Sequence, residues 1–280
     1  MLDDSVSDDR RLSRRSFLGA AAVGAAGAAL HPFPSFGAGA PFEVAMQGYS
    51  LKELNLHYLL AAARELGVDQ LELYDRQFSV FMSERHRTQA RAELEAAGVA
   101  VPATYTDQFT DDEEAAREVL EFGRQMGLRF FSCTPDESTL RLLDRLAPEY
   151  GVGIALHNPG PEPGKSFVEL AEVADVLERF GNVDACVDVG NFARAGTDPV
   201  EALRQLRGQV LEVHVKDVTA DGSHTLLGDG VIDLPGVFGE LREAGFDGLV
   251  TLEYGGAPES IDARIDDLQA NLNRLRKWVG

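Results

Sequence analysis

The hydrophobic residues of this chain follow two periods that alternate along it. From Pro41 onward, short and nearly continuous apolar runs, typical of buried strands, alternate with segments whose apolar residues recur every three or four positions, typical of amphipathic helices. The pattern predicts eight strands, at Glu43–Gly48, Gln70–Tyr74, Val99–Tyr105, Leu128–Cys133, Val152–His157, Val183–Val189, Val210–Val215 and Leu249–Tyr254. Glycines just past several helical segments predict where those helices end, at Gly67, Gly98, Gly127, Gly208 and Gly245.

The strict alternation of strands and helices predicts a parallel sheet. Eight such units within residues 41–280 fit a (β/α)8 TIM barrel, which typically takes about 250 residues, better than an open doubly wound sheet. The first unit has no glycine-rich dinucleotide loop, which disfavours a Rossmann fold. We therefore predict one α/β barrel domain over residues 41–280, with its functional groups where strands end and the following loops begin.

Residues 1–40 have a different character and are predicted to be an export signal. Arg14 and Arg15 precede an apolar run that is rich in alanine and glycine and extends to Leu30, and residues 38–40 have the small-residue pattern of a cleavage site. Paired arginines before a short, weakly hydrophobic segment are typical of a bacterial twin-arginine signal, whereas a transmembrane anchor needs roughly 20 apolar residues. We expect the twin-arginine translocase to be a partner during export, and the mature protein to work in the periplasm or elsewhere outside the cytoplasm.

Composition and charge narrow the range of partners. The 280 residues are 44% hydrophobic and 26% charged, as in an ordinary globular protein, and the formal net charge is −20. A surface this acidic repels phosphate backbones, so nucleic acid is excluded as the expected partner. The two cysteines, Cys133 and Cys186, lie in apolar runs and are predicted to be reduced core thiols.

Four of the predicted strands end in residues of metal-ligand type. His157, Asp188, His214 and Glu253 lie at the ends of the last four strands in chain order. Neighbouring parallel strands are only about 4.8 Å apart, so these side chains converge if all of them point into the barrel. Two imidazoles and two carboxylates form a mixed nitrogen and oxygen site suited to Mn²⁺, Zn²⁺ or Co²⁺. Each residue alone has an ordinary structural explanation, but two buried carboxylates side by side are costly without a cation.

The order and spacing of several motifs resemble the xylose isomerase-like TIM barrel family, also called the sugar phosphate isomerase/epimerase family. The resemblance covers essentially all of residues 41–280. The segments that carry it are Val68–Tyr74, Ile154–Asn158, Cys186–Asn191, Val213–Asp217, Leu227–Asp233 and Gly248–Glu253. It implies a divalent metal held at His157, Asp188, His214 and Glu253, and proton transfer at a carbon next to a carbonyl.

The chain departs from the family pattern at three positions. In the family's isomerases and epimerases, the ligand on the fifth strand is usually a glutamate that forms an acid/base pair with the glutamate of the eighth strand. Here His157 takes its place, Pro159 stands where a histidine is frequent, and Asn191 replaces a second histidine. These departures put epimerisation by two carboxylates in doubt.

Three residues are candidates for the chemistry itself. Glu253 is the first choice for the base, because a carboxylate on the eighth strand can face both the ion and the substrate carbon. His157 is an alternative general acid or base if it does not bind the metal. Lys216 has the same side-chain parity as His214, so it either donates to a hydroxyl or an oxyanion, or forms an ion pair with Asp217 or Asp188.

Further polar residues are candidates for substrate binding. Glu72, on the second strand, would hydrogen-bond sugar hydroxyls or orient a ligand, or else pair with a helix terminus or an arginine. Asn158 and Asn191 are candidate amide contacts to hydroxyls, although asparagine after a strand is also common in turns. His224 lies in a long loop and is a candidate to close over the ligand.

The sequence supports three functions in a definite order. The first is an exported, metal-dependent sugar isomerase or epimerase acting on an unphosphorylated sugar, since no glycine-rich phosphate cradle lies near the strand ends. The second is a metal-dependent lyase that cleaves 3-keto-glycosides by elimination, which needs one base and a leaving-group acid. The third is a non-catalytic sugar-binding barrel. Members of the family often pair through their helices, so a homo-oligomer is possible.

Overall fold

The predicted barrel is present in the computed structural model, which describes residues 42–256, 258 and 260–280. Eight parallel strands close into a barrel in the order β1-β10-β7-β6-β5-β4-β3-β2. The strands are β1 (Glu43–Gln47), β2 (Gln70–Tyr74), β3 (Ala100–Tyr105), β4 (Phe130–Cys133), β5 (Gly153–His157), β6 (Val183–Asp188), β7 (Val210–Val215) and β10 (Leu249–Leu252). The predicted (β/α)8 fold is confirmed. The predicted signal, residues 1–40, lies outside the described residues.

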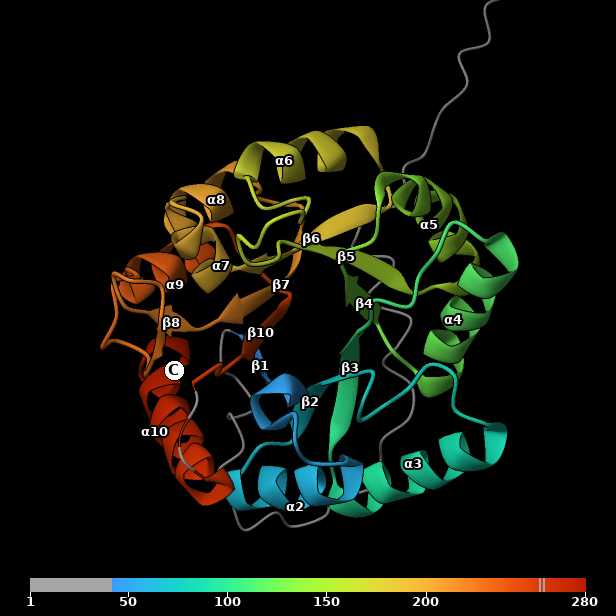
Figure 1. Cartoon of the computed structure of the whole chain (residues 1–280), viewed down its shortest axis with the longest axis horizontal. Helices are drawn as coiled ribbons and strands as arrows, with labels where there is room; N and C mark the ends of the chain where they lie inside the picture. The colour runs from blue at the N-terminus through green and yellow to red at the C-terminus, as the bar shows by residue number, and fades with distance from the viewer. Residues whose placement is uncertain (1–41, 257, 259) are drawn as a thin grey trace, which may run out of the picture. The chain divides into compact units, whose positions relative to one another are not determined.

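Helices form a ring around the strands (Figure 1). They are α2 (Leu56–Leu66), α3 (Glu84–Ala97), α4 (Glu113–Met126), α5 (Glu137–Tyr150), α6 (Leu170–Arg179), α7 (Val189–Arg194), α8 (Pro199–Gln205), α9 (Leu234–Glu243) and α10 (Ile261–Val279), with a 3₁₀ turn, η2 (Gly48–Leu51), after β1. Gly67 and Gly98 end α2 and α3 in the left-handed conformation, as their positions predict. None of the helices in the described residues combines the length and the apolar character needed to cross a bilayer.

The barrel interior changes from apolar to polar along the strands. At one level it is filled by a small apolar cluster, which consists of Ala45, Ala103, Phe130, Ala155, Cys186 and Leu249. Because side chains alternate between the two faces of a strand, the residue two positions further along points inward again. Those next inward positions are Gln47, Tyr105, Ser132, His157, Asp188 and Thr251. The strand period therefore places a polar layer directly above the apolar one.

Two local features add to the regular barrel pattern. Helix α7 begins immediately after β6, and the Asp188 side chain accepts a hydrogen bond from the backbone N–H of Asn191 at 2.9 Å, which caps it. After β7 the chain forms an antiparallel hairpin of β8 (Asp217–Val218) and β9 (His224–Thr225). Both features lie next to the predicted ligands.

Candidate metal centre and active site

The four predicted ligands lie on neighbouring strands at the polar end of the barrel. His157 and Asp188 are the last residues of β5 and β6, His214 is one residue from the end of β7, and Glu253 directly follows β10. The register pairs Asp188 with His214. Donor atoms of His157, Asp188 and His214 all lie within 4.8 Å of one another, and these residues could hold a metal ion. Glu253 stands beside this group, with Oε2 3.2 Å from Nδ1 of His214.

Lys216 lies between two of these carboxylates. Its Nζ is 2.7 Å from Oδ2 of Asp188 and 2.8 Å from Oε1 of Glu253. Burial raises the pKa of both carboxyls, but Lys216 and the nearby imidazoles outweigh it, so the pKa of Asp188 is lowered and that of Glu253 lies well below its usual value. A Cβ on Gly190 would overlap the Lys216 side chain, so this position requires glycine. Because two ionised carboxylates lie within 2.8 Å of its Nζ, the Lys216 side chain is held as an ammonium.

The alternative partner for Lys216, Asp217, is engaged elsewhere. Its carboxylate accepts hydrogen bonds from the backbone N–H groups of Gly228, Gly230 and Ile232, at 2.8, 3.0 and 3.2 Å. Asp217 therefore orders the loop between β9 and α9. Of the two ion pairs considered from the sequence, only the one with Asp188 is found.

His157 is held by groups that the sequence analysis did not identify. Its Nε2 lies 3.4 Å from Oδ2 of Asp188, and its Nδ1 lies 3.4 Å from the Thr134 hydroxyl, which also donates to the His157 carbonyl at 3.1 Å. The Tyr105 ring meets the imidazole edge-on at 5.5 Å between centroids, and burial raises the pKa of its phenol to about 12. Tyr105 ends β3 with inward parity, the same signal that identified His157 on β5.

Asn158 and Asn191 hold Asp188 in place. Asn158 accepts a hydrogen bond from the Asp188 backbone N–H at 2.7 Å and donates to its carbonyl at 3.1 Å. The Asn191 amide donates to Oδ2 of Asp188 at 2.9 Å and to the Asn158 carbonyl at 3.1 Å. Both amides thus orient a candidate ligand, and their contact with a substrate stays a prediction.

A second layer of carboxylates lies beneath the first. Nε2 of His214 is 2.8 Å from Oε2 of Glu72 and 3.4 Å from Oε2 of Glu212, and all three side chains are buried. Burial and the nearby Glu212 raise the pKa of Glu72 to about 7. Burial opposes protonation of His214, but Cys186, Glu72 and Glu212 outweigh it and raise its pKa well above the usual value. Sequence reasoning missed Glu212, although its parity with His214, two residues later on β7, was a usable signal.

The β8–β9 hairpin brings His224 to the site. A Cβ on Gly255 would lie 2.6 Å from the His224 ring, so the imidazole packs directly against the backbone that follows Glu253. Burial, and then the charge of Lys216, lower the pKa of His224, which keeps its ring neutral. Its buried Nδ1 has no hydrogen-bond partner in the part of the chain that the structure describes. His224 thus lies near the candidate ligands, and its closing over a ligand stays a prediction.

The charges of the two layers do not balance within the protein. Four carboxylates, those of Asp188, Glu253, Glu72 and Glu212, face one ammonium, and a protonated His214 still leaves an excess of negative charge. Buried charge of this kind is costly without a compensating cation. Oε2 of Glu72, Oε2 of Glu212 and both ring nitrogens of His214 are also buried without a hydrogen-bond partner among the described residues. The donor set therefore fits a divalent cation.

A deeper donor group shares one residue with the first. Cys186, Glu212 and His214 also bring ligand atoms within 4.8 Å of one another. Burial raises the pKa of the Cys186 thiol well above its usual value, which disfavours the thiolate that a metal would need. We therefore take the group of His157, Asp188 and His214 as the candidate metal centre.

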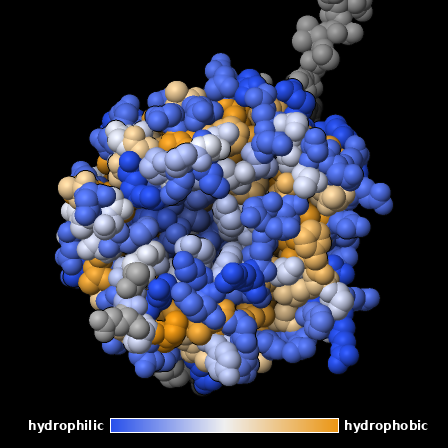
Figure 2. All heavy atoms as spheres, in the orientation of Figure 1, coloured by the Kyte–Doolittle hydropathy of each residue, from blue (hydrophilic) through white to orange (hydrophobic). Residues whose placement is uncertain are grey.

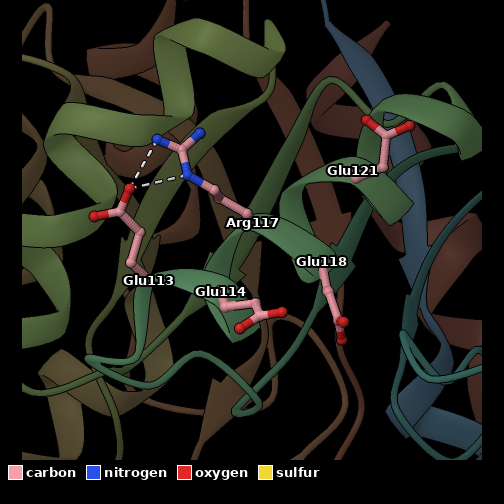
Figure 3. Close-up of a pocket in the computed structure, with 5 residues that line it drawn as sticks. All are labelled: Glu113, Glu114, Arg117, Glu118 and Glu121. Carbon is pink, nitrogen blue, oxygen red and sulfur yellow. Dashed lines mark hydrogen bonds and ion pairs between the residues drawn. The ribbon is translucent and has the colours of Figure 1, made fainter.

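The surface supports a site at the centre of the barrel. Figure 2, drawn in the orientation of Figure 1, shows a central hollow lined by hydrophilic residues. A separate groove runs along α4 on the outer ring, lined by Glu113, Glu114, Arg117, Glu118 and Glu121 (Figure 3). There Arg117 pairs with Glu113 at 2.9 Å and with Glu149 at 2.7 Å, as on a solvated helix face.

Comparisons with known proteins agree with this fold. The sequence profile of the Xylose isomerase-like TIM barrel family matches residues 137–278. Inosose dehydratase of Clostridium beijerinckii is 26% identical over 132 residues, which are 41% of this chain and 44% of that protein. The rhizopine catabolism protein MocC of Rhizobium meliloti is 31% identical over 135 residues, 40% of this chain and 39% of that protein. The chain thus matches less than half the length of each of these two curated relatives.

Solved structures resemble nearly the whole barrel. The IolI protein with a bound zinc atom has a TM-score of 0.69 at 19% identity, covering 85% of this chain and 98% of that one. D-psicose 3-epimerase of Clostridium cellulolyticum H10 with D-tagatose also has a TM-score of 0.69, at 14% identity, covering 85% and 99%. At these identities the likeness shows the fold.

Proposed function

The chain belongs to the xylose isomerase-like TIM barrel family, and from this we propose that it is a metal-dependent lyase. Its substrate is an unphosphorylated keto-sugar, such as a 3-keto-glycoside, or a related cyclic keto-polyol. The enzyme removes a proton next to the carbonyl and expels the oxygen on the following carbon as water or an alcohol. The inosose dehydratases among its relatives support this choice, because a dehydratase performs such an elimination.

One observation favours elimination over epimerisation, which is part of the function that the sequence ranks first. Of the four carboxylates in the site, Glu253 alone reaches the opening, with 13% of its side chain exposed, whereas those of Asp188, Glu72 and Glu212 are at 0%. Epimerisation needs two proton-transfer groups on opposite faces of the substrate carbon. Elimination needs one, because the same carboxylate can take the proton from carbon and give it to the departing oxygen.

The proposed roles follow from the geometry. His157, Asp188 and His214 would hold the cation, which when bound polarises the carbonyl and makes the adjacent C–H more acidic. Glu253 takes the proton, and its low pKa keeps the carboxylate ionised before the proton is transferred. Lys216, 2.8 Å from Glu253, donates a hydrogen bond to the oxygen that gains negative charge.

The remaining predicted substrate contacts are arranged around this centre. His224, on its hairpin, would cover the substrate and contact a hydroxyl through Nδ1, which has no partner within the described residues. Asn158 and Asn191 act chiefly by orienting Asp188. Glu72 lies below the opening and contacts His214, which supports a ligand-orienting role over a contact with sugar hydroxyls.

A second candidate is the isomerase or epimerase. His157 is the other ionisable group of the centre that reaches the opening, with 11% of its side chain exposed. If it does not bind the metal, it provides the second proton-transfer group. The function then depends on whether His157 is a ligand.

Incubation in D₂O separates these functions. The metal-loaded protein is incubated with free ketoses and with 3-keto-glycosides, and products are followed by NMR and mass spectrometry. Release of an alcohol or water with formation of an unsaturated ketone supports the lyase. Solvent deuterium in an intact sugar supports isomerisation and contradicts our proposal. Saturable sugar binding without either reaction would indicate a binding protein.

Export by the twin-arginine route is part of the same proposal and rests on Arg14 and Arg15 and the apolar run that follows them. An extracytoplasmic location agrees with an unphosphorylated substrate. Changing both arginines to lysine should keep the protein in the cytoplasm, which cell fractionation would measure. Unchanged export would contradict this part.

A further inference from the structure

Two buried carboxylates converge on one nitrogen of His214 beneath the candidate metal centre. Oε2 of Glu72 and Oε2 of Glu212 lie 2.8 Å and 3.4 Å from Nε2. Neither oxygen, nor Nε2 itself, has a hydrogen-bond partner among the described residues. The imidazole N–H is therefore the donor within reach of both.

Each carboxylate is oriented by a hydroxyl group. Thr251 donates to Oε1 of Glu212 at 2.5 Å, and Ser132 donates to Oε1 of Glu72. In both residues the hydroxyl engages Oε1 and leaves Oε2 facing the imidazole. The four side chains come from β2, β4, β7 and β10, so the arrangement is built into the closed barrel.

We propose that Glu212 acts with Glu72 as a pair of positioning residues, which keep the proton of His214 on Nε2 and present Nδ1 to the metal ion. A ring nitrogen binds a metal through its lone pair, and the hydrogen bond made by the other nitrogen fixes which one is free. Nδ1 faces Glu253, at the level of the opening. This inference rests on the metal centre of the proposed function and is independent of the reaction performed there.

The same contacts direct the metal ion to the upper of the two donor groups. Glu212 belongs to the deeper group with Cys186 and His214. Once Glu72 and Glu212 occupy Nε2, that nitrogen is no longer free for an ion beside Cys186. His157 presents the opposite nitrogen, because its Nε2 faces Asp188 while its Nδ1 faces Thr134.

Metal affinity tests the proposal without any substrate. The dissociation constant for Zn²⁺ is measured by chelator competition for the wild type and for Glu212→Leu, Glu72→Leu, Glu212→Gln and Glu72→Gln. We expect the leucine variants to bind Zn²⁺ about 10–100-fold more weakly. Glutamine keeps an oxygen acceptor for Nε2–H, so the glutamine variants should lose less.

Glu240→Gln is the matched control. Glu240 lies on α9, away from the strand ends, and is also buried. Its Oε1 is 2.5 Å from the Arg207 guanidinium. Its variant should bind Zn²⁺ like the wild type, although its melting temperature changes. A loss of affinity equal to that of the leucine variants would show that any buried charge has the same effect and would overturn the proposal.

Two further measurements cover variants that fail to fold. Thr251→Val and Ser132→Ala release the carboxylates without removing them and should weaken Zn²⁺ binding several-fold. ¹⁵N NMR of the imidazoles in the zinc-loaded wild type should show the proton of His214 on Nε2. Wild-type affinity in folded leucine variants, a proton on Nδ1, or no zinc binding by the wild type would each overturn the proposal. A catalytically silent protein that passes these tests would overturn only the proposed reaction.

Discussion

Glu253 in the upper polar layer of the barrel and Glu72 in the layer below it have pKa values shifted in opposite directions. In the rim layer of His157, Asp188, Lys216 and Glu253, each carboxylate has the ammonium of Lys216 within 2.8 Å, and the pKa of Glu253 is well below its usual value. In the lower layer the carboxylate of Glu72 lies near that of Glu212, neither pairs with an ammonium of the described residues, and the pKa of Glu72 rises to about 7.

Depth and partner therefore decide what a glutamate does in this barrel. A carboxylate at the rim is ionised and reaches the opening, so it can act on a substrate. A carboxylate one layer below is closed off from the opening and acts on His214 alone. His214 joins the layers, with Nδ1 toward Glu253 and Nε2 toward Glu72.

Removing a predicted metal ligand of the rim layer should have the largest effect. Asp188→Ala takes away a fully buried carboxylate in contact with His157 and Lys216. We expect the variant to lose its bound metal entirely, as measured by elemental analysis of the purified protein. His86→Ala, at an exposed histidine on α3, is the control and should keep its metal. One equivalent of metal retained by Asp188→Ala would contradict the ligand assignment.

Neutralising Glu253, the partly exposed carboxylate of the rim layer, should slow proton abstraction. Glu253→Gln keeps the shape of the side chain but removes the base, and general-base catalysis typically contributes about 10²–10⁴-fold. We expect kcat for elimination to fall by this factor, measured as the rate at which the unsaturated ketone forms. If this rate stays at the wild-type value, the base is another group.

The position of Lys216 can be disturbed from two sides. Lys216→Met removes the ammonium, while Gly190→Ala places a methyl group where the lysine side chain passes. Each change should lower kcat by about 10²-fold, as for loss of a donor to a developing oxyanion. Because both act through one contact, the double variant should be no slower than Lys216→Met.

Gly239→Ala is the control for the glycine change. Gly239 lies in α9, and a Cβ there meets nothing within 4 Å. Its kcat should equal that of the wild type. Fully additive losses in the double variant of Gly190 and Lys216 would show that the two changes act independently.

A carboxylate outside both layers should show the smallest effect. Asp75 directly follows β2 and is half-buried. Burial, together with the Asp107 side chain, raises its pKa to about 6. Between pH 4 and pH 6 the folded state holds more protons than the unfolded state, so this group makes stability fall as pH rises through that window. Above pH 6 we expect Asp75→Asn to be more stable by about 1 kcal/mol, a value reduced for solvent screening.

Thermal melts at two pH values check this expectation. Asp75→Asn should raise the melting temperature at pH 7 and leave it unchanged at pH 3.5, where the wild-type carboxyl is protonated in the folded protein. An equal gain at both pH values would show that the effect is not electrostatic.

The sequence predicts the rim layer better than the layer below it. His157 and Asp188 end apolar runs, so their place at the strand ends follows from the period alone. Glu212 lies near the middle of β7, and its inward direction acquires a meaning only when barrel closure brings β2 and Glu72 to the same point. Contacts between distant strands are not contained in the local pattern.

The contacts of loops and short elements could not be predicted from the sequence for a similar reason. The sequence left two ion-pair partners for Lys216, Asp188 and Asp217. Asp217 instead accepts hydrogen bonds from backbone N–H groups 11 to 15 residues later, which the local sequence pattern does not show. The β8–β9 hairpin has two residues on each side, too few to show a period. Its effect on the position of His224 emerges only in the folded chain.

The position of the metal ion tests the central claim most directly. A crystal of the zinc-loaded protein, measured on both sides of the zinc absorption edge, gives an anomalous difference map that locates the ion. Our account predicts one peak at the rim, within about 2.0–2.2 Å of Nδ1 of His214, Nε2 of His157 and a carboxylate oxygen of Asp188. A peak beside the sulfur of Cys186, or no peak at either group, would contradict it.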